Sequence, residues 1–173
     1  MHRPFAMLLL ATLLAVTGCQ QSPATASPEK ADTAATPSGR PQPKLPTMKL
    51  WLGAHEISAE LATTPKQHET GMMFRTNMGT MEGMLFIFQW PEQRAFWMKN
   101  TLVPLDVAYI DPAGIIREIH PLHPLNENPV PSETADIQYV LEMNQGWFAS
   151  QNVGVGMEIR TEKGTFRDTF FRH

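Results

Sequence analysis

Two apolar runs at the centre of the chain, residues 95–98 and 105–110, constrain the fold more than any other feature. Neither run alternates apolar with polar side chains, so each is typical of a strand that is buried on both faces. The polar residues that lie between and just inside these runs are Lys99, Asn100, Thr101 and Asp106. Polar groups beside buried backbone need hydrogen-bonding partners, or they cost stability. We therefore predict a core of β-strands with a polar candidate site near its centre.

The amino-terminal residues are typical of an export signal. Arg3 precedes an apolar run over residues 5–16, which is too short for an ordinary transmembrane helix. The sequence Val16-Thr17-Gly18-Cys19 that follows resembles the bacterial lipobox. We predict a lipoprotein signal peptide at residues 1–18 and lipidation of Cys19. Because Cys19 is the only cysteine, an intramolecular disulfide is excluded.

Lipidation predicts where the protein resides. Acyl chains gain roughly 0.8 kcal/mol per buried methylene, so a multiply acylated Cys19 is a stable membrane anchor. In resemblance to sorted lipoproteins of Gram-negative bacteria, Gln20 after the cysteine favours the periplasmic face of the outer membrane. We expect an envelope protein whose membrane partner is reached through the lipid anchor.

Composition divides the rest of the chain into a tether and one domain. Residues 19–46 are rich in Pro, Ala, Ser and Thr and contain few large apolar side chains, which predicts a disordered tether. Residues 47–173 are long enough for one globular domain with a real core. The net charge of −3 gives no basic surface, so nucleic acid is not an expected partner.

Short apolar segments predict the elements of the domain. Helices are expected near residues 64–74, with Thr64 as the N-cap, and 147–152. Besides the two central runs, strands are expected at 48–52, 57–61, 84–88, 115–120, 137–143, 157–161 and, in the tail, 166–171. This pattern predicts a β-rich α+β fold, a small, partly closed, β-barrel-like domain with two short helices.

Several motifs together resemble those of a known family. They are Gly71-Met72-Met73-Phe74-Arg75, Gly83-Met84-Leu85-Phe86, Phe96-Trp97-Met98-Lys99-Asn100-Thr101, Pro104-Leu105-Asp106 and Tyr139-Val140-Leu141-Glu142. This series is similar to the domain of unknown function 192 family over residues 48–160. The resemblance implies a compact β-rich fold and assigns no reaction. The chain departs from the family pattern at His120 and His123 and in its aromatic tail.

Six polar residues form the candidate ligand-binding site: Arg75, Lys99, Asn100, Thr101, Asp106 and Glu142. Arginine and lysine side chains suit a small polar or anionic ligand, with the carboxylates orienting them. The same residues could instead form a buried structural network in which Lys99 pairs with Asp106 or Glu142. A third reading is a periplasmic, hydrolase-like enzyme that uses Lys99 with Asp106 as base and Glu142 as acid.

Two metal hypotheses stay open. Met78, Met81 and Met84 have the spacing of a soft Cu(I) site, although methionine also fills apolar cores. His120 and His123 lie near acidic residues without the spacing of a known motif. We predict no cofactor and no bound metal. The predicted role is a non-catalytic small-ligand-binding or accessory module, and the sequence does not identify a protein partner.

Overall fold

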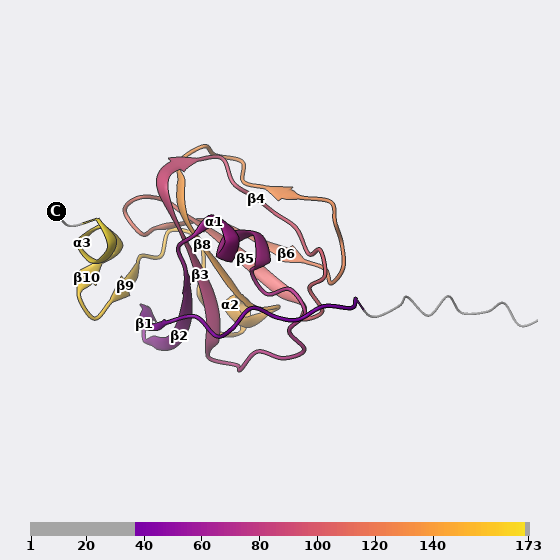
Figure 1. Ribbon diagram of the computed structural model, residues 1–173. Coiled ribbons are helices and arrows are strands. Elements are labelled where there is room, and N and C mark those ends of the chain that lie inside the picture. Colours follow the sequence, from indigo (N-terminus) through magenta and orange to yellow (C-terminus); the bar gives the residue numbers. More distant parts are fainter. Residues whose placement is uncertain (1–36, 172–173) are drawn as a thin grey trace, which may run out of the picture. The chain divides into compact units, whose positions relative to one another are not determined.

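The computed structural model describes residues 37–171, and these residues form one domain (Figure 1). The expected signal peptide, Cys19 and most of the expected tether lie outside the described residues. Within residues 37–171, no helix has the length and apolar character needed to cross a membrane.

Ten strands and three short helices make up the domain, one helix more than the sequence predicted. The strands are β1 (Thr47–Leu52), β2 (His55–Ala62), β3 (Glu82–Glu92), β4 (Ala95–Phe96), β5 (Leu105–Ile110), β6 (Ile116–Leu122), β7 (Val130–Pro131), β8 (Ile137–Asn144), β9 (Ile159–Thr161) and β10 (Gly164–Thr165). The helices are α1 (Pro65–Thr70), α2 (Trp147–Ser150) and α3 (Phe166–Phe170).

Eight of the strands form one sheet in the order β10-β9-β1-β2-β3-β8-β5-β6. Its pairs are antiparallel except for β2 and β3, which run parallel. Among the described residues the sheet does not close into a barrel, so the barrel-like expectation holds only loosely. A single bridge between Ile115 and Glu158 connects the β6 side to the chain before β9.

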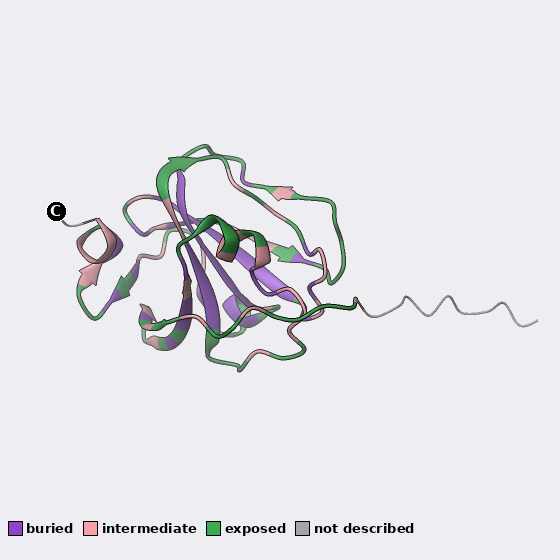
Figure 2. Cartoon of the chain, in the orientation of Figure 1, coloured by how far each residue is buried: buried purple, intermediate pink, exposed green. Residues whose placement is uncertain are grey.

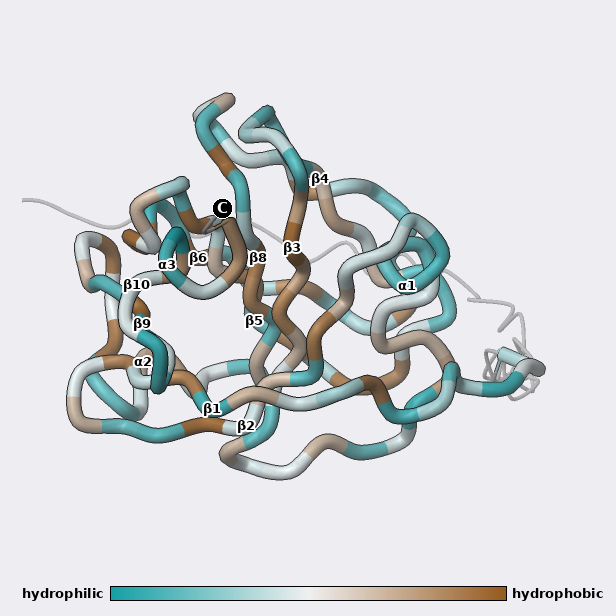
Figure 3. The backbone as a smooth tube through the Cα atoms, turned by 60° about the vertical axis from the view of Figure 1, so that its left-hand side comes forward, coloured by the Kyte–Doolittle hydropathy of each residue, from teal (hydrophilic) through white to brown (hydrophobic). Residues whose placement is uncertain are grey.

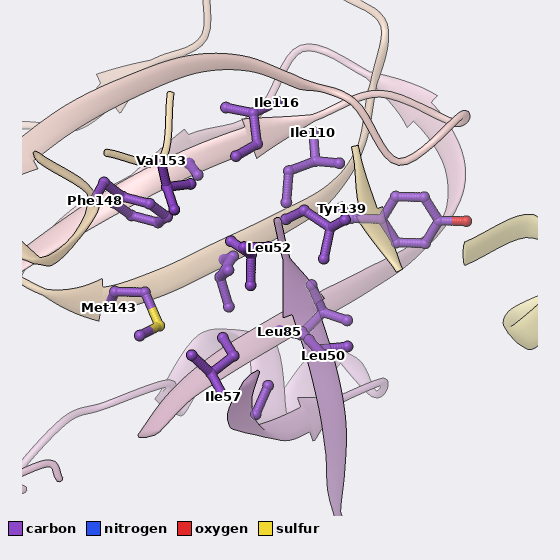
Figure 4. Close-up of a cluster of buried hydrophobic side chains, with 14 of the residues drawn as sticks. Leu50, Leu52, Ile57, Leu85, Ile110, Ile116, Tyr139, Met143, Phe148 and Val153 are labelled. Atoms are coloured by element: carbon purple, nitrogen blue, oxygen red, sulfur yellow. The ribbon is translucent and has the colours of Figure 1, made fainter. Parts of the chain in front are cut away.

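One apolar core lies on each face of the sheet. The first core contains Leu50, Leu52, Ile57, Leu85, Ile110, Ile116, Tyr139, Leu141, Met143, Trp147, Phe148, Val153, Ile159 and Phe166, many of which converge in Figure 4. The second core contains Ala62, Met72, Met84, Phe86, Met98, Val103, Leu105, Val107, Tyr109, Leu122, Ile137 and Val140. Strands β5 and β8 are buried along almost their whole length, and most of their residues are apolar (Figures 2 and 3). Burial on both faces explains why residues 105–110 show no alternation.

The other central run is not the buried strand that the sequence predicted. Only Ala95 and Phe96 are in β4, which pairs with β7 in a separate two-stranded ladder. Ala95 and Trp97 are exposed, and Met98 alone is fully buried. This ladder lies outside the eight-stranded sheet, so one side of the run faces water.

Local capping explains where two helices begin and end. Thr64 caps α1 as predicted, because its hydroxyl accepts from the Gln67 N–H and the Gln67 side chain accepts from the Thr64 N–H. The helix ends at Thr70 instead of Phe74, since Gly71 adopts a positive φ of 46°. The predicted tail strand is wrong: Thr165 caps the Asp168 N–H and starts α3 there.

The last residues of the expected tether pack along the domain. The Gln42 side chain donates a 2.9 Å hydrogen bond to the Gly71 carbonyl, and the Leu45 N–H donates a 2.8 Å bond to Glu60. The ordered domain therefore begins several residues before position 47.

Candidate functional site

A pocket of about 250 Å³ lies over the second core, and residues of α1, of the turn that follows it and of β4 line it. Its floor includes Phe86 of β3 and Glu142 of β8, and its walls include residues of α1, of the following turn and of β4. This volume is near the lower end for small-molecule sites, which are typically concave and largely apolar with a few polar groups.

Glu142 is a buried, ionisable group on the otherwise apolar floor of the pocket. On β8 it lies between Met84 of β3 and Val107 of β5, both of which belong to the second core. Its side chain is buried, and within residues 37–171 the Oε2 atom has no hydrogen-bonding partner. Burial raises the pKa of the Glu142 carboxyl to about 8, and the nearby charge of Arg75 opposes this only in part. The carboxyl is therefore mostly protonated at neutral pH.

Aromatic side chains line the same pocket as Glu142. The Phe86 and Phe96 rings meet edge to face with their centroids 4.8 Å apart. The His68 ring lies 4.5 Å from the Phe88 ring, centroid to centroid, and its Nε2 atom is 2.9 Å from the Ala62 carbonyl oxygen. Burial holds the pKa of His68 below its ordinary value, so His68 is neutral at neutral pH. The walls are thus apolar and uncharged at these positions.

Arg94 brings a cation to the same pocket, but its donors are occupied. Its guanidinium pairs with Glu92 and donates to the Trp90 carbonyl oxygen at 2.6 Å and the Ile137 carbonyl oxygen at 3.4 Å. The guanidinium carbon lies 3.7 Å from the centroid of the Phe88 ring. Arg94 is therefore held in place by the protein itself.

Arg75 was expected to bind a ligand and instead pairs with Glu60. The guanidinium donates bonds of 2.5 and 2.8 Å to the two carboxylate oxygens, and both side chains are largely buried. Burial raises the pKa of Glu60, but hydrogen bonds from Arg75 and from the Leu45 N–H outweigh it and bring this pKa below its ordinary value. Arg75 does not line the pocket over Glu142.

The structure separates the three polar residues of the central break. Lys99 is half-exposed, 3.9 Å from the Glu127 carboxylate, so the predicted pairing with Asp106 or Glu142 is wrong. Asn100 has a positive φ of 53° and its carbonyl accepts from the Phe74 N–H, which makes it a turn residue. Thr101 is buried and lines the pocket with Glu142.

The Asp106 side chain lies on the other face of the sheet, where its Oδ2 atom accepts a 2.8 Å hydrogen bond from the Gly146 N–H. It is paired with Met143 of the first core, whereas Glu142 is paired with Val107 of the second core. Directly opposite residues in an antiparallel pair share a face, so the Asp106 and Glu142 side chains point away from each other across the sheet. Acting together as base and acid on one substrate is therefore excluded for these two carboxyl groups.

The residues of the metal hypotheses lie in different environments. Met84 is fully buried, Met78 packs at the edge of the second core, and Met81 is exposed. His120 lies 2.9 Å from Glu118, and His123 is exposed. Within residues 37–171 no three His, Cys, Asp or Glu side chains are grouped closely enough to hold a metal ion.

Of the six candidate residues, the pocket brings together only Thr101 and Glu142. Sequence reasoning missed the rest of its lining, which includes His68, Phe86, Phe88, Arg94 and Phe96. Phe96 and Phe86 were inside motifs that the sequence singled out, but their apolar character indicated core rather than pocket.

The fold and the site define a class: a β-rich α+β domain that carries a cavity with a buried carboxyl on one face of an open sheet. The chain belongs to the domain of unknown function 192 family, described as an uncharacterized ACR, whose sequence pattern matches residues 48–161.

Two solved structures are similar to this chain. One is a protein of Sinorhizobium meliloti 1021 described as a "putative transcription regulator", with 34% identity and a TM-score of 0.66 over 69% of this chain and 97% of that one. The other is a protein of unknown function from Novosphingobium aromaticivorans DSM 12444, with 31% identity and a TM-score of 0.65 over 78% of this chain and 99% of that one. No curated protein matches the chain.

Proposed function

We propose that this protein is a lipid-anchored binding module of the bacterial envelope, which holds a small ligand in the pocket over Glu142. The observation that carries the proposal is the buried carboxyl of Glu142, a residue that lines a cavity of about 250 Å³ and whose Oε2 atom has no hydrogen-bonding partner within residues 37–171. A buried polar atom without a partner costs free energy that a purely structural residue would not impose. A ligand that supplies the missing hydrogen bond would recover that cost.

The proposed binding site is the pocket over Glu142, and not the full set of six polar residues that the sequence indicated. Arg75, Asn100 and Asp106 are committed to partners within the protein, and Lys99 lies at the surface near Glu127. The proposed ligand contacts are therefore Glu142, Thr101 and the aromatic walls. The Thr101 hydroxyl donates a 3.2 Å hydrogen bond to the Lys99 carbonyl oxygen and not to a basic side chain, which supports a binding role for the pocket.

The envelope location rests on the sequence alone, since Cys19 lies outside the described residues. The test is membrane fractionation of cells that produce the full chain or its Cys19→Ala variant. The wild-type protein should sediment with the outer membrane, and the variant should be lost from that fraction. Equal distribution of the two would remove the anchor from the proposal.

The proposed function does not include the regulation of transcription, which is the description given to the Sinorhizobium protein. The net charge of −3 does not favour binding to nucleic acid, because proteins that bind nucleic acid usually carry a basic surface. An export signal is likewise at odds with a chromosomal target.

Binding itself is tested by a thermal-shift screen of the full chain against small amines, alcohols, carboxylates, sugars and peptidoglycan fragments. A ligand at a hundredfold excess over its dissociation constant should stabilise the protein by roughly 2.7 kcal/mol. The shift should disappear in a Thr101→Val or Phe96→Ala variant that still folds. If no compound of any class shifts the transition, the binding role is wrong.

A further inference from the structure

The pocket walls are suited to a cation. Phe86 and Phe96 line the cavity, and their rings meet edge to face with centroids 4.8 Å apart. The faces of aromatic rings attract cations that lie within about 6 Å of the ring centroid. Arg94 already lies over Phe88 in this way at 3.7 Å.

Several ionisable groups line the pocket or face it. Within residues 37–171, Glu142 is the acidic group among them that has no counter-ion. Arg75 faces Glu142 and lowers its pKa in part, but its guanidinium is committed to Glu60. Arg94 is paired with Glu92. A ligand cation near Glu142 would therefore supply the counter-ion that the carboxyl needs when it ionises.

The remaining titratable groups at this site do not compete for that role. Burial lowers the pKa of His68 and raises that of Tyr109, so both are uncharged at neutral pH. Glu69, at the rim, forms a 3.0 Å ion pair with Lys66. Glu142 is the group that a ligand charge would meet inside the cavity.

We propose that the pocket binds a small organic ammonium, which donates an N–H hydrogen bond to the Glu142 carboxylate and places its apolar body between the aromatic walls. This rests on the proposed binding function and names the ligand class of the same site. A cavity of about 250 Å³ favours a monoamine with one ring or a short chain over a larger ligand.

Binding of such a ligand moves a proton. At neutral pH the free protein holds a neutral Glu142 acid, and the complex holds a carboxylate beside an ammonium. The carboxyl proton passes to the solvent, and the ligand keeps its own proton. Affinity should therefore rise with pH until Glu142 is ionised in the free protein.

The experiment is calorimetric titration of the full chain with matched compounds that differ in charge: benzylammonium, benzyl alcohol and benzoate, then pentylammonium, pentanol and pentanoate. Each is titrated at about pH 6 and about pH 9. With a free-protein pKa of about 8, the ammonium affinity should be roughly 100-fold higher at the upper pH. Titration at pH 7 in buffers of different ionisation enthalpy should report the release of close to one proton for each ligand bound.

Two variants complete the test. Glu142→Gln keeps the shape of the side chain and cannot ionise, so ammonium binding should fall at least 10-fold at pH 9 and lose its pH dependence. Glu162→Gln makes the same chemical change at an exposed position in the turn between β9 and β10 and should leave binding unchanged. Circular dichroism of both variants checks that they fold.

The outcomes separate the ligand class from the binding function. If an alcohol or a carboxylate binds at least as well as its ammonium counterpart, or if ammonium affinity does not change with pH, the ammonium proposal is wrong and the binding role survives. If neither these compounds nor any in the thermal-shift screen bind, both proposals fall.

Discussion

Arg75 donates two hydrogen bonds, of 2.5 and 2.8 Å, to the carboxylate of Glu60. Glu60 of β2 and Glu142 of β8 flank Met84 of β3 on the same face of the sheet, so Arg75 lies near both carboxyl groups. The Arg75 guanidinium forms its hydrogen bonds with Glu60 and not with Glu142. Within residues 37–171 the Glu142 carboxyl is therefore buried without an ion-pair partner, and this defines the character of the pocket.

Breaking this pair should be costly. Arg75→Met leaves the Glu60 carboxylate largely buried without its main partner, so we expect a loss of roughly 2–4 kcal/mol in the free energy of unfolding. The Glu60→Met/Arg75→Met double variant should be more stable than Arg75→Met alone, because it removes the uncompensated charge. Urea denaturation at pH 7 measures both. A double variant no more stable than the single one would show that the pair itself, and not the orphaned carboxylate, sets the cost.

Glu142→Gln should change the pH dependence of stability. The folded pKa of about 8 lies above the ordinary value of 4.5, so the folded protein binds more protons than the unfolded one between these values. The wild type should therefore lose stability as pH rises from about 4.5 to about 8, by an amount on the order of 4 kcal/mol. The Gln variant lacks this loss.

Chemical denaturation of the wild type and Glu142→Gln across this pH range makes the comparison. The two should be similarly stable near pH 5, and the advantage of the variant should grow with pH and level off above pH 8. Glu162→Gln is the matched control, since its carboxyl is exposed. Parallel pH profiles for wild type and Glu142→Gln would contradict the prediction.

Asp106 should contribute to the stability of the fold and not to ligand binding. Its Oδ2 atom accepts a 2.8 Å hydrogen bond from the N–H of Gly146, the residue before α2. Asp106→Ala should lose roughly 1 kcal/mol, because it removes the part-buried hydrogen bond from the Gly146 N–H. Asp106→Asn keeps an acceptor oxygen and should lose less. Thermal and urea unfolding measure the difference, and both variants should retain ligand binding at the pocket.

Glu118 should hold the loop that follows β7. Its carboxylate accepts from the N–H groups of Glu133 and Thr134 and lies 2.9 Å from His120 Nε2. Burial raises the pKa of Glu118, but these contacts outweigh it and bring the pKa below its ordinary value. The stability that Glu118 contributes is therefore present above about pH 4.5 and is lost as pH falls through the folded pKa.

Glu118→Gln should accordingly destabilise the protein at pH 7 by roughly 1–2 kcal/mol and much less near pH 3. Hydrogen exchange should show faster exchange of the Glu133 and Thr134 amides in the variant at pH 7. Unchanged amide protection would mean that the loop is held by other contacts.

The sequence was most informative where one local signal decided the structure. The largely apolar run at 105–110, which does not alternate, correctly predicted a strand buried on both faces, and Thr64 before Pro65 correctly predicted the start of α1. The tail was wrong because its aromatic residues suit a strand or a helix, and the Thr165 cap decided for the helix.

The candidate site depended on strand pairing, which the sequence does not contain. Asp106 and Glu142 look like partners in the sequence, but the register of β5 and β8 puts them on opposite faces. Arg75 and Glu60 come close together because β2 runs parallel to β3, after a crossover that includes α1. Glu142 was found because a charged residue within an apolar strand needs an explanation whatever the pairing is.

The central claim is that Glu142 is a buried, unpaired carboxyl on the floor of a pocket, and its own titration tests this most directly. Carbon-13 NMR of the glutamate side-chain carboxyl groups, assigned with Glu142→Gln, should give an apparent pKa near 8 for Glu142 in the free protein. A value at or below 4.5 would mean that water or a cation already satisfies the carboxyl, and the proposed pocket would lose the feature on which its function rests.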